Sequence, residues 1–397
     1  MQDKLKKILP YLFYLSLTIE LSVVLHDRSV WMILPEGQIC RVTFLLFALK
    51  VCFTKYSMKE WIWLTVFVVF TGFMYFVTGQ NVALRSVFFV AAMRDIEIMK
   101  AMKYTFWLTL GGSILLVILS FFDMGGRGIS TTEVFRGGEI TTRYHFGFGH
   151  PNTFHCGILM LLLLFLYCYH KKLNWQAYLS LLVANFGLSL LTGSQTGFAI
   201  CSLAILVAMG FHVFPKLRST NGVYWAGMLV LLFCVGVSIL AAVYADHGRF
   251  WTEGSWAERL DSIFTGRIKE LHFGAPSVSA RAAEWTLFGG NATFNYRFDM
   301  GWVRLFYWFG IIPAALFVIS HLLLLNECRR QKDYMALVMI TIVAIYTVVE
   351  GQFISLFLGR NSLLFLFGMY WGAMLMTKSD EYPGEELNWW RLLRHRG

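Results

Sequence analysis

Residues 224–245 read YWAGMLVLLFCVGVSILAAVYA and include no charged side chain. A helix needs about 20 apolar residues to cross the hydrocarbon core of a bilayer, and this run supplies them. A second run, over 158–169, is equally apolar. Of the 397 residues, 57% are hydrophobic and 15% are charged, and mean hydropathy is +0.58. The sequence predicts an integral membrane protein. Its spans should be helical, because the alternating strands of a membrane β-barrel are missing from the sequence.

Hydropathy predicts an all-α fold: a polytopic helix bundle of about twelve transmembrane helices with two long outside loops. The predicted spans are 8–26, 38–54, 60–78, 81–96, 104–122, 151–169, 174–192, 196–214, 224–245, 300–324, 335–352 and 361–376. The chain is thereby divided into helices 1–5 (1–122), a first loop (123–149), helices 6–9 (150–245), a second loop (246–299), helices 10–12 (300–376) and a tail (377–397). The second loop is long enough to hold short helices of its own.

Positive charge marks the turns that we assign to the inside. These turns carry Lys4, Lys6, Lys7, Lys55, Lys59, Arg94, Lys100, Lys103, Lys171, Lys172, Lys216, Arg218, Arg329, Arg330 and Lys332. Basic turns face the cytoplasm, so both termini are expected there, and the net charge of +10 needs no nucleic-acid partner. The seven cysteines lie mostly in apolar spans without metal or disulfide spacing, which is typical of packing residues.

The two long outside segments are rich in arginine and contain one lysine, Lys269. Arginine grips phosphate and carboxylate groups through two parallel hydrogen bonds. The alternative is that about half of these arginines pair with acidic residues of the same loops. The arginines are Arg127, Arg136, Arg143, Arg249, Arg259, Arg267, Arg281 and Arg297.

Four ionisable residues fall in the outer halves of predicted spans: Glu20, Arg85, Arg304 and Glu350. Charges within a bilayer usually face a wet cavity or a partner, although side chains near helix ends also reach back to the interface. Together they indicate a polar cavity that opens outward.

The polar segment RYHFGFGHPN, residues 143–152, ends at the start of an apolar run. His150-Pro-Asn152 predicts an entry from loop to helix, because proline suits the first helical turn. His150 and Asn152 therefore either act in a site or cap this helix, and the sequence leaves both roles open. Three further polar segments follow in order: TGSQTG at 192–197, Thr265-Gly-Arg267, and Asp299 ahead of Gly310.

In order and spacing, these segments resemble motifs of the O-antigen polymerase and ligase superfamily, and most closely its Wzy-like polysaccharide-polymerase branch. The late pair Glu350 and Asn361 also resembles a family pattern, and the resemblance covers roughly residues 60 to 376. Two positions depart from the family motifs, since Gln195 replaces an arginine and Met300 replaces an asparagine. The ligase branch commonly carries histidine where this chain has Asp299, which favours the polymerase branch.

The resemblance implies a GT-C-like, metal-independent glycosyltransferase without a cofactor, in the bacterial cytoplasmic (inner) membrane. Its substrates would be glycans linked to undecaprenyl pyrophosphate, with the bilayer as surroundings and a chain-length regulator as a compatible partner. Asp299 is expected to be the general base, with His150 as its rival. Arg143 and Arg267 are expected to bind pyrophosphate, and Arg304 and Arg281 are weaker candidates. The remaining expected substrate contacts are Asn152, Gln195, Thr196 and Glu350.

Three other functions remain open: ligase-like transfer of a glycan, transport of a lipid-linked oligosaccharide, and non-catalytic assembly. A transporter should place charge near the bilayer midplane and show repeat symmetry, and this chain shows no internal repeat. The observation that separates enzyme from transporter is whether the two long loops fold onto one cavity lined by Arg143 and Arg267.

Overall fold

The structure of the protein is a computed structural model. It describes residues 2–31, 34–122, 131–136, 139–245, 254–273, 280–289, 298–354 and 360–375. Three of the loop arginines discussed above, Arg127, Arg249 and Arg297, and the predicted tail over 377–397 lie outside the described residues.

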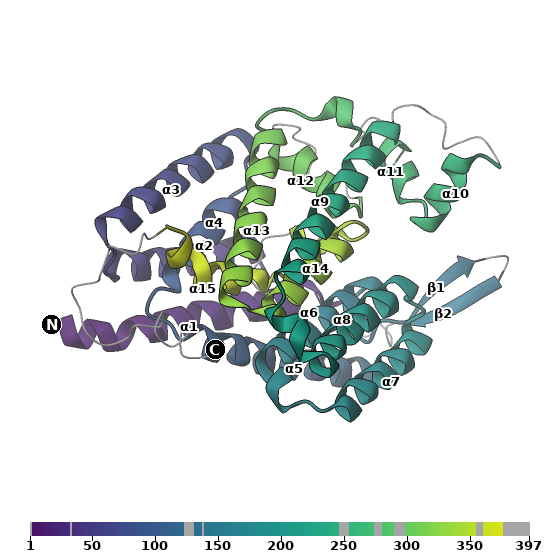
Figure 1. The fold of residues 1–397 in the computed structure, drawn as a ribbon, viewed down its shortest axis with the longest axis horizontal. Coiled ribbons are helices and arrows are strands. Elements are labelled where there is room, and N and C mark those ends of the chain that lie inside the picture. The colour runs from purple at the N-terminus through teal and green to yellow at the C-terminus, as the bar shows by residue number, and fades with distance from the viewer. Residues whose placement is uncertain are drawn as a thin grey trace.

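Helices make up most of the described chain (Figure 1). In the first half these are α1 (Gln2–Asp27), α2 (Glu36–Phe53), α3 (Met58–Thr78), α4 (Val82–Ala92), α5 (Ile98–Phe121), α6 (Pro151–Tyr169), α7 (Trp175–Thr192) and α8 (Gln195–Val213). In the second half these are α9 (Asn221–Tyr244), α10 (Trp256–Ile263), α11 (Arg267–Phe273), α12 (Gly301–Phe309), α13 (Ile311–Gln331), α14 (Tyr334–Thr347) and α15 (Leu363–Leu375). Short 3₁₀ turns cover His170–Lys172, Pro215–Ser219, Ala282–Glu284 and Gly351–Ile354.

Seven helices of the described chain are long and apolar enough to cross a membrane: α1, α3, α5, α6, α8, α9 and α13. Two more, α4 and α14, are apolar but shorter. The prediction of an all-α membrane fold is confirmed at the level of class, whereas these seven helices are fewer than the twelve predicted spans. Helices α10 and α11 are the short helices expected within the second long loop.

The predicted span over 300–324 is wrong in its boundaries, because the chain breaks at Gly310. This residue has a φ of +91°, and a Cβ there would lie 2.7 Å from the backbone of Phe288. The backbone N–H of Ile311 donates to the carbonyl of Thr286 at 2.9 Å, so loop residues before the break are bonded to it. As a result α12 is a buried helix of nine residues, and the membrane-length helix is α13.

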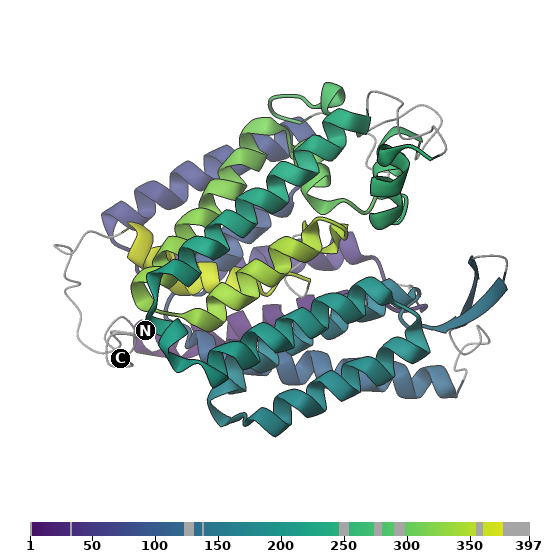
Figure 2. The same ribbon diagram turned by 45° about the vertical axis from the view of Figure 1, so that its right-hand side comes forward.

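The first long loop contains two strands, which the all-α expectation did not include. Strands β1 (Thr131–Arg136) and β2 (Glu139–Tyr144) pair antiparallel and project beyond the bundle (Figure 2). Their register places Thr132 opposite Arg143. The hairpin thereby delivers Arg143 to the start of the loop that leads into α6.

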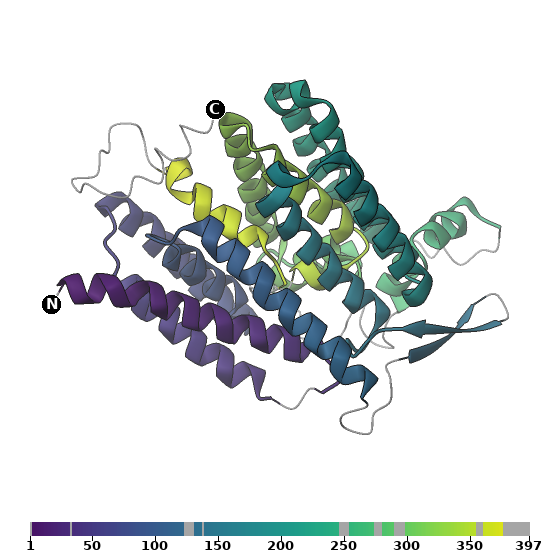
Figure 3. The ribbon, with the colours of Figure 1, turned by 90° about the horizontal axis from the view of Figure 1, so that it is seen from below.

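Helix α1 begins, and α15 ends, at the end of the bundle opposite the hairpin (Figures 1 and 3). Two of the basic turns meet there: Arg218 lies 5.0 Å from the ring centroid of Tyr334, and Lys332 lies 5.6 Å from that of Tyr224. The Asp333 carboxylate accepts hydrogen bonds from the hydroxyls of Tyr167 at 2.8 Å and Tyr370 at 2.6 Å. These bonds join α6 and α15 to the start of α14.

Two apolar clusters organise the interior. The larger one fills the bundle, and the smaller one lies at the end that carries the hairpin. The smaller cluster contains Ala242 of α9, Ala257 of α10, Leu271 of α11, Val303 of α12 and Phe298, which precedes α12. It packs the second long loop against the bundle and so fixes the position of Arg267 and Asp299.

Candidate functional site

Arg143 bridges the hairpin and the turn between α7 and α8. Its side chain is buried, and its Nε donates to the backbone carbonyl of Thr192 at 2.7 Å. Gly193 ends α7 with a φ of +59°, and a Cβ there would lie 3.0 Å from the Arg143 Nε. The close approach of arginine to this turn therefore depends on glycine.

The His150-Pro-Asn152 turn starts α6, as the sequence predicted. His150 is the N-cap, and its Nδ1 accepts a hydrogen bond from the backbone N–H of Asn152 at 3.1 Å. The Asn152 Oδ1 accepts from the Ser194 hydroxyl at 3.3 Å, which links this turn to the TGSQTG segment. Burial lowers the pKa of His150, Arg143 lowers it further, and Asp299 opposes both effects. Because Nδ1 accepts this hydrogen bond, a neutral His150 ring carries its proton on Nε2, and Nε2–H is the group that can donate.

The Thr265-Gly-Arg267 turn is held by the carboxylate of Asp261. This carboxylate accepts from the backbone N–H groups of Ile268 at 2.9 Å and Lys269 at 3.0 Å, at the start of α11. Thr265 has a φ of +55°, a left-handed conformation that costs a non-glycine residue free energy. The Arg267 guanidinium donates to the Thr265 hydroxyl and to the Phe264 carbonyl.

Arg267 also contacts Asp299, with 3.4 Å between Nη2 and Oδ2. The guanidinium is buried, whereas the Asp299 side chain is 45% exposed. An arginine at this distance keeps Asp299 oriented while leaving the carboxylate accessible from the cavity.

These three turns surround a cavity of about 370 Å³. It is lined by Arg143, Asn152, Gly193, Ser194, Gln195, Thr196, Thr265, Gly266, Arg267, Glu270 and Asp299. Both long loops thus contribute, together with the turn between α7 and α8. Six of the ten predicted site residues line this cavity: Arg143, Asn152, Gln195, Thr196, Arg267 and Asp299.

Four predicted residues lie outside the cavity lining. His150 caps α6 beside it. Arg304 donates to the carbonyl of Phe298, the residue before Asp299, and its guanidinium lies 4.8 Å from the ring centroid of Trp308. Arg304 therefore fixes the backbone next to Asp299 without lining the cavity itself.

Glu350 and Arg281 are the other two. Glu350 is buried just after α14, where its backbone carbonyl faces Gly301. Arg281 forms an ion pair with Glu284 at 3.1 Å, which is the loop-charge role that the sequence left open.

Glu270 is the lining residue that lies outside every polar segment selected in the sequence analysis. Burial raises the pKa of its carboxyl group, and the Asp299 charge raises it further. A hydrogen bond from the Asp299 backbone and the charges of Arg267 and Arg304 lower it. Its position three residues after Arg267 on α11 was the available signal, because residues so spaced share a helix face. The cavity therefore holds two carboxylates and two guanidinium groups.

None of the four span charges lines this cavity, and two of them, Glu20 and Arg85, belong to a different part of the bundle. Glu20 and Arg85 form a buried ion pair between α1 and α4, and Thr43 donates to the same carboxylate. They pair with one another through Glu20 Oε1 and do not line the cavity, contrary to the prediction that these charges share one outward cavity.

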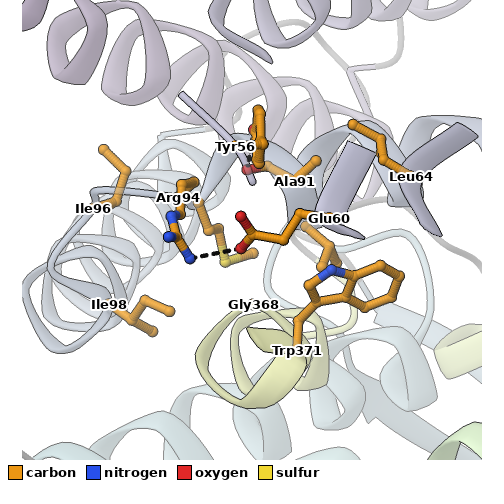
Figure 4. A pocket seen from close by; sticks show the side chains of 11 residues that line it. Tyr56, Glu60, Leu64, Ala91, Arg94, Ile96, Ile98, Gly368 and Trp371 are labelled. Carbon is orange, nitrogen blue, oxygen red and sulfur yellow. Dashed lines mark hydrogen bonds and ion pairs between the residues drawn. The ribbon is translucent and has the colours of Figure 1, made fainter. Parts of the chain in front are cut away.

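A second hollow of about 30 Å³ lies among α3, α4 and α15 (Figure 4). Here Glu60 and Arg94 pair at 2.8 Å, and Trp371 closes one side. Such a volume holds roughly one water molecule. The larger cavity is the better candidate for a substrate.

No protein-family model, curated protein or solved structure matches this chain.

Proposed function

We propose that the protein is a polymerase that joins oligosaccharide repeat units carried on undecaprenyl pyrophosphate. The observation that supports this proposal is the cavity in which Arg143 from one long loop and Arg267 from the other face the same space beside Asp299. The bundle beneath it contains helices apolar enough to hold a lipid tail in the membrane. A lipid-linked anionic substrate needs both features at once.

In the proposed reaction, a sugar hydroxyl of the acceptor attacks the anomeric carbon of the donor glycan. The new glycosidic C–O bond forms as the C–O bond to pyrophosphate breaks, and lipid pyrophosphate leaves with the electron pair. Arg143 and Arg267 stabilise its growing negative charge. The hydroxyl proton passes to a carboxylate of the cavity, and amide and hydroxyl groups of Asn152, Gln195 and Thr196 hold the sugars.

Asp299 is the proposed proton acceptor. Its carboxylate lines the cavity and is oriented by Arg267, and Arg304 holds the carbonyl of the preceding residue. His150 is the weaker choice, because its Nδ1 lone pair is already used to cap α6. This geometry supports Asp299 over His150 as the proposed base.

The test is polymerisation by purified protein in nanodiscs, read as glycan chain length from a lipid-linked repeat unit. Arg267→Ala should slow extension about a hundredfold, the usual cost of removing a preorganised donor. Arg267→Lys should recover part of the rate, because lysine keeps the charge without the planar fork.

Arg281→Ala is the matched control, since Arg281 lies in the same loop, pairs with Glu284 and does not line the cavity. It should extend chains normally. Normal chain lengths from Arg267→Ala would refute the proposal, and a product with one added unit in the unaltered protein would identify ligase-like transfer instead.

A further inference from the structure

Helix α10 leaves an apolar face exposed at the end of the bundle that carries the cavity. Trp256, Leu260 and Ile263 follow the i, i+4, i+7 spacing of one helix face. Leu260 lies at the edge of this face, half-buried against the smaller apolar cluster. Trp256 is 57% exposed and Ile263 is 76% exposed. On another side of the helix, Ala257 and Asp261 are buried against the protein.

The third side of α10 is polar. Glu258, Arg259 and Ser262 are all exposed there. A helix with one face on protein, one polar face and one exposed apolar face is typical of a helix that lies in a membrane interface. Two exposed apolar side chains alone would not decide this, because single exposed apolar residues are common.

The apolar face of α10 continues the outer surface of α9, which is a membrane-length helix. Along α9, Phe233 and Leu240 are largely exposed, and Tyr244 is the last helical residue. The ring of Tyr244 meets that of Trp256 edge to face, with 5.8 Å between centroids and 90° between planes. Tyrosine and tryptophan concentrate where a bilayer meets water, so this pair indicates the level of that boundary.

Helix α10 is also tied to the cavity. Its buried Asp261 accepts from the backbone N–H groups that start α11, and Arg267 is the first residue of that helix. Ala257 belongs to the same apolar cluster as Leu271 of α11. A force that holds α10 at one depth therefore holds the Arg267 turn at a corresponding depth.

We propose that α10 is an interfacial helix whose Trp256, Leu260 and Ile263 face rests in the lipid headgroup region, and that it thereby sets the height of the Arg267 turn above the bilayer. The occupant of this face is lipid, because the face is continuous with the lipid-facing surface of α9. This inference is independent of the reaction that the cavity performs.

The test measures the depth of single labelled positions in nanodiscs of phosphatidylethanolamine and phosphatidylglycerol. Cys52 is the exposed cysteine, so both labelled variants also carry Cys52→Ser. The signal from the Cys52→Ser protein without a further cysteine is subtracted, because it measures any labelling of the half-buried Cys168. Ile263→Cys and Ser262→Cys are labelled in turn with an environment-sensitive fluorophore. The two positions are adjacent in sequence but lie about 100° apart on the helix, so Ser262 is the matched control.

Nitroxide-labelled lipid should quench the fluorophore at position 263 at least threefold more than the fluorophore at position 262. The reason is that the apolar face of an interfacial helix lies roughly 5–10 Å within the boundary between headgroups and acyl chains, whereas its polar face points to water. Equal quenching, or water-like emission at 263 in a nanodisc that contains no other protein, would overturn the proposal. Both side chains are exposed, so both variants should fold, and equal melting temperatures would verify it.

Discussion

Gly193→Ala tests whether Arg143 shapes the cavity, and Gly79→Ala is its matched control. Both glycines end helices in the left-handed region, with φ of +59° at Gly193 and +71° at Gly79. Alanine in this region costs about 1–2 kcal/mol at either position. Only the surroundings differ, because a Cβ at Gly79 meets nothing within 4 Å, whereas one at Gly193 lies 3.0–3.4 Å from Nε, Cγ and Cδ of Arg143.

The Arg143 side chain must therefore shift by a few tenths of an ångström when Gly193 becomes alanine. The 2.7 Å bond from its Nε to the Thr192 carbonyl then weakens, and the guanidinium turns within the cavity. A misplacement of about 1 Å in a site can lower a rate by about a hundredfold, so we expect roughly a tenfold slower chain extension from this smaller shift.

The measurements are melting temperature in detergent and the rate of chain extension in nanodiscs. Both variants should lose similar stability, and only Gly193→Ala should lose activity beyond that loss. Equal rates for the two variants, at equal amounts of folded protein, would show that the Arg143 contact with this turn does not shape the site.

Three further outcomes are expected. Asp299→Asn should slow turnover about a hundredfold while substrate still binds, whereas His150→Asn, which keeps a capping oxygen, should retain most activity; the reverse result would exchange their roles. Glu270→Gln should raise the melting temperature at about pH 8, and the gain should vanish towards about pH 4. A carboxyl group whose pKa is raised on folding costs stability as pH rises above its unfolded pKa, and the cost is complete above its folded pKa. A gain that does not change with pH would contradict this. Gly197→Ala should destabilise the protein by about 1–3 kcal/mol in thermal unfolding, because its Cβ would lie 2.6 Å from His155; an unchanged melting temperature would show that this contact relaxes freely.

The sequence predicted features that local chemistry determines. Pro151 after a polar turn predicted the start of α6, and Gly193 marks the end of α7. The break at Gly310 escaped prediction because apolar residues continue on both sides of it, and its cause is a contact with residues 288 and 289 of a preceding loop. Hydropathy records composition and carries no information about such a contact.

The sequence also could not predict which charged residues pair with one another. The spans alone could not reveal that Glu20 pairs with Arg85, because many arrangements of helices would satisfy either charge. Glu270 is one of the acidic loop residues that the sequence offers as arginine partners, although its helical spacing from Arg267 also places it on the same helix face. The hairpin could have been predicted from the sequence, because β-branched residues such as Val134 and Ile140 lie on both sides of Gly137-Gly138, a pair typical of tight turns.

The break between α12 and α13 at Gly310 restricts which second mutations can compensate for a first one. A side chain at Gly227 would collide with Leu337, so a smaller residue at 337 offers a route to second-site suppression. At Gly310 the colliding atoms all belong to the main chain, and at Gly289 they include the carbonyl oxygen of Trp308 besides the Thr78 side chain, and no substitution removes a main-chain atom. Genetic screens for revertants should therefore recover suppressors of Gly227 variants in α14, but only true reversions at Gly289 and Gly310.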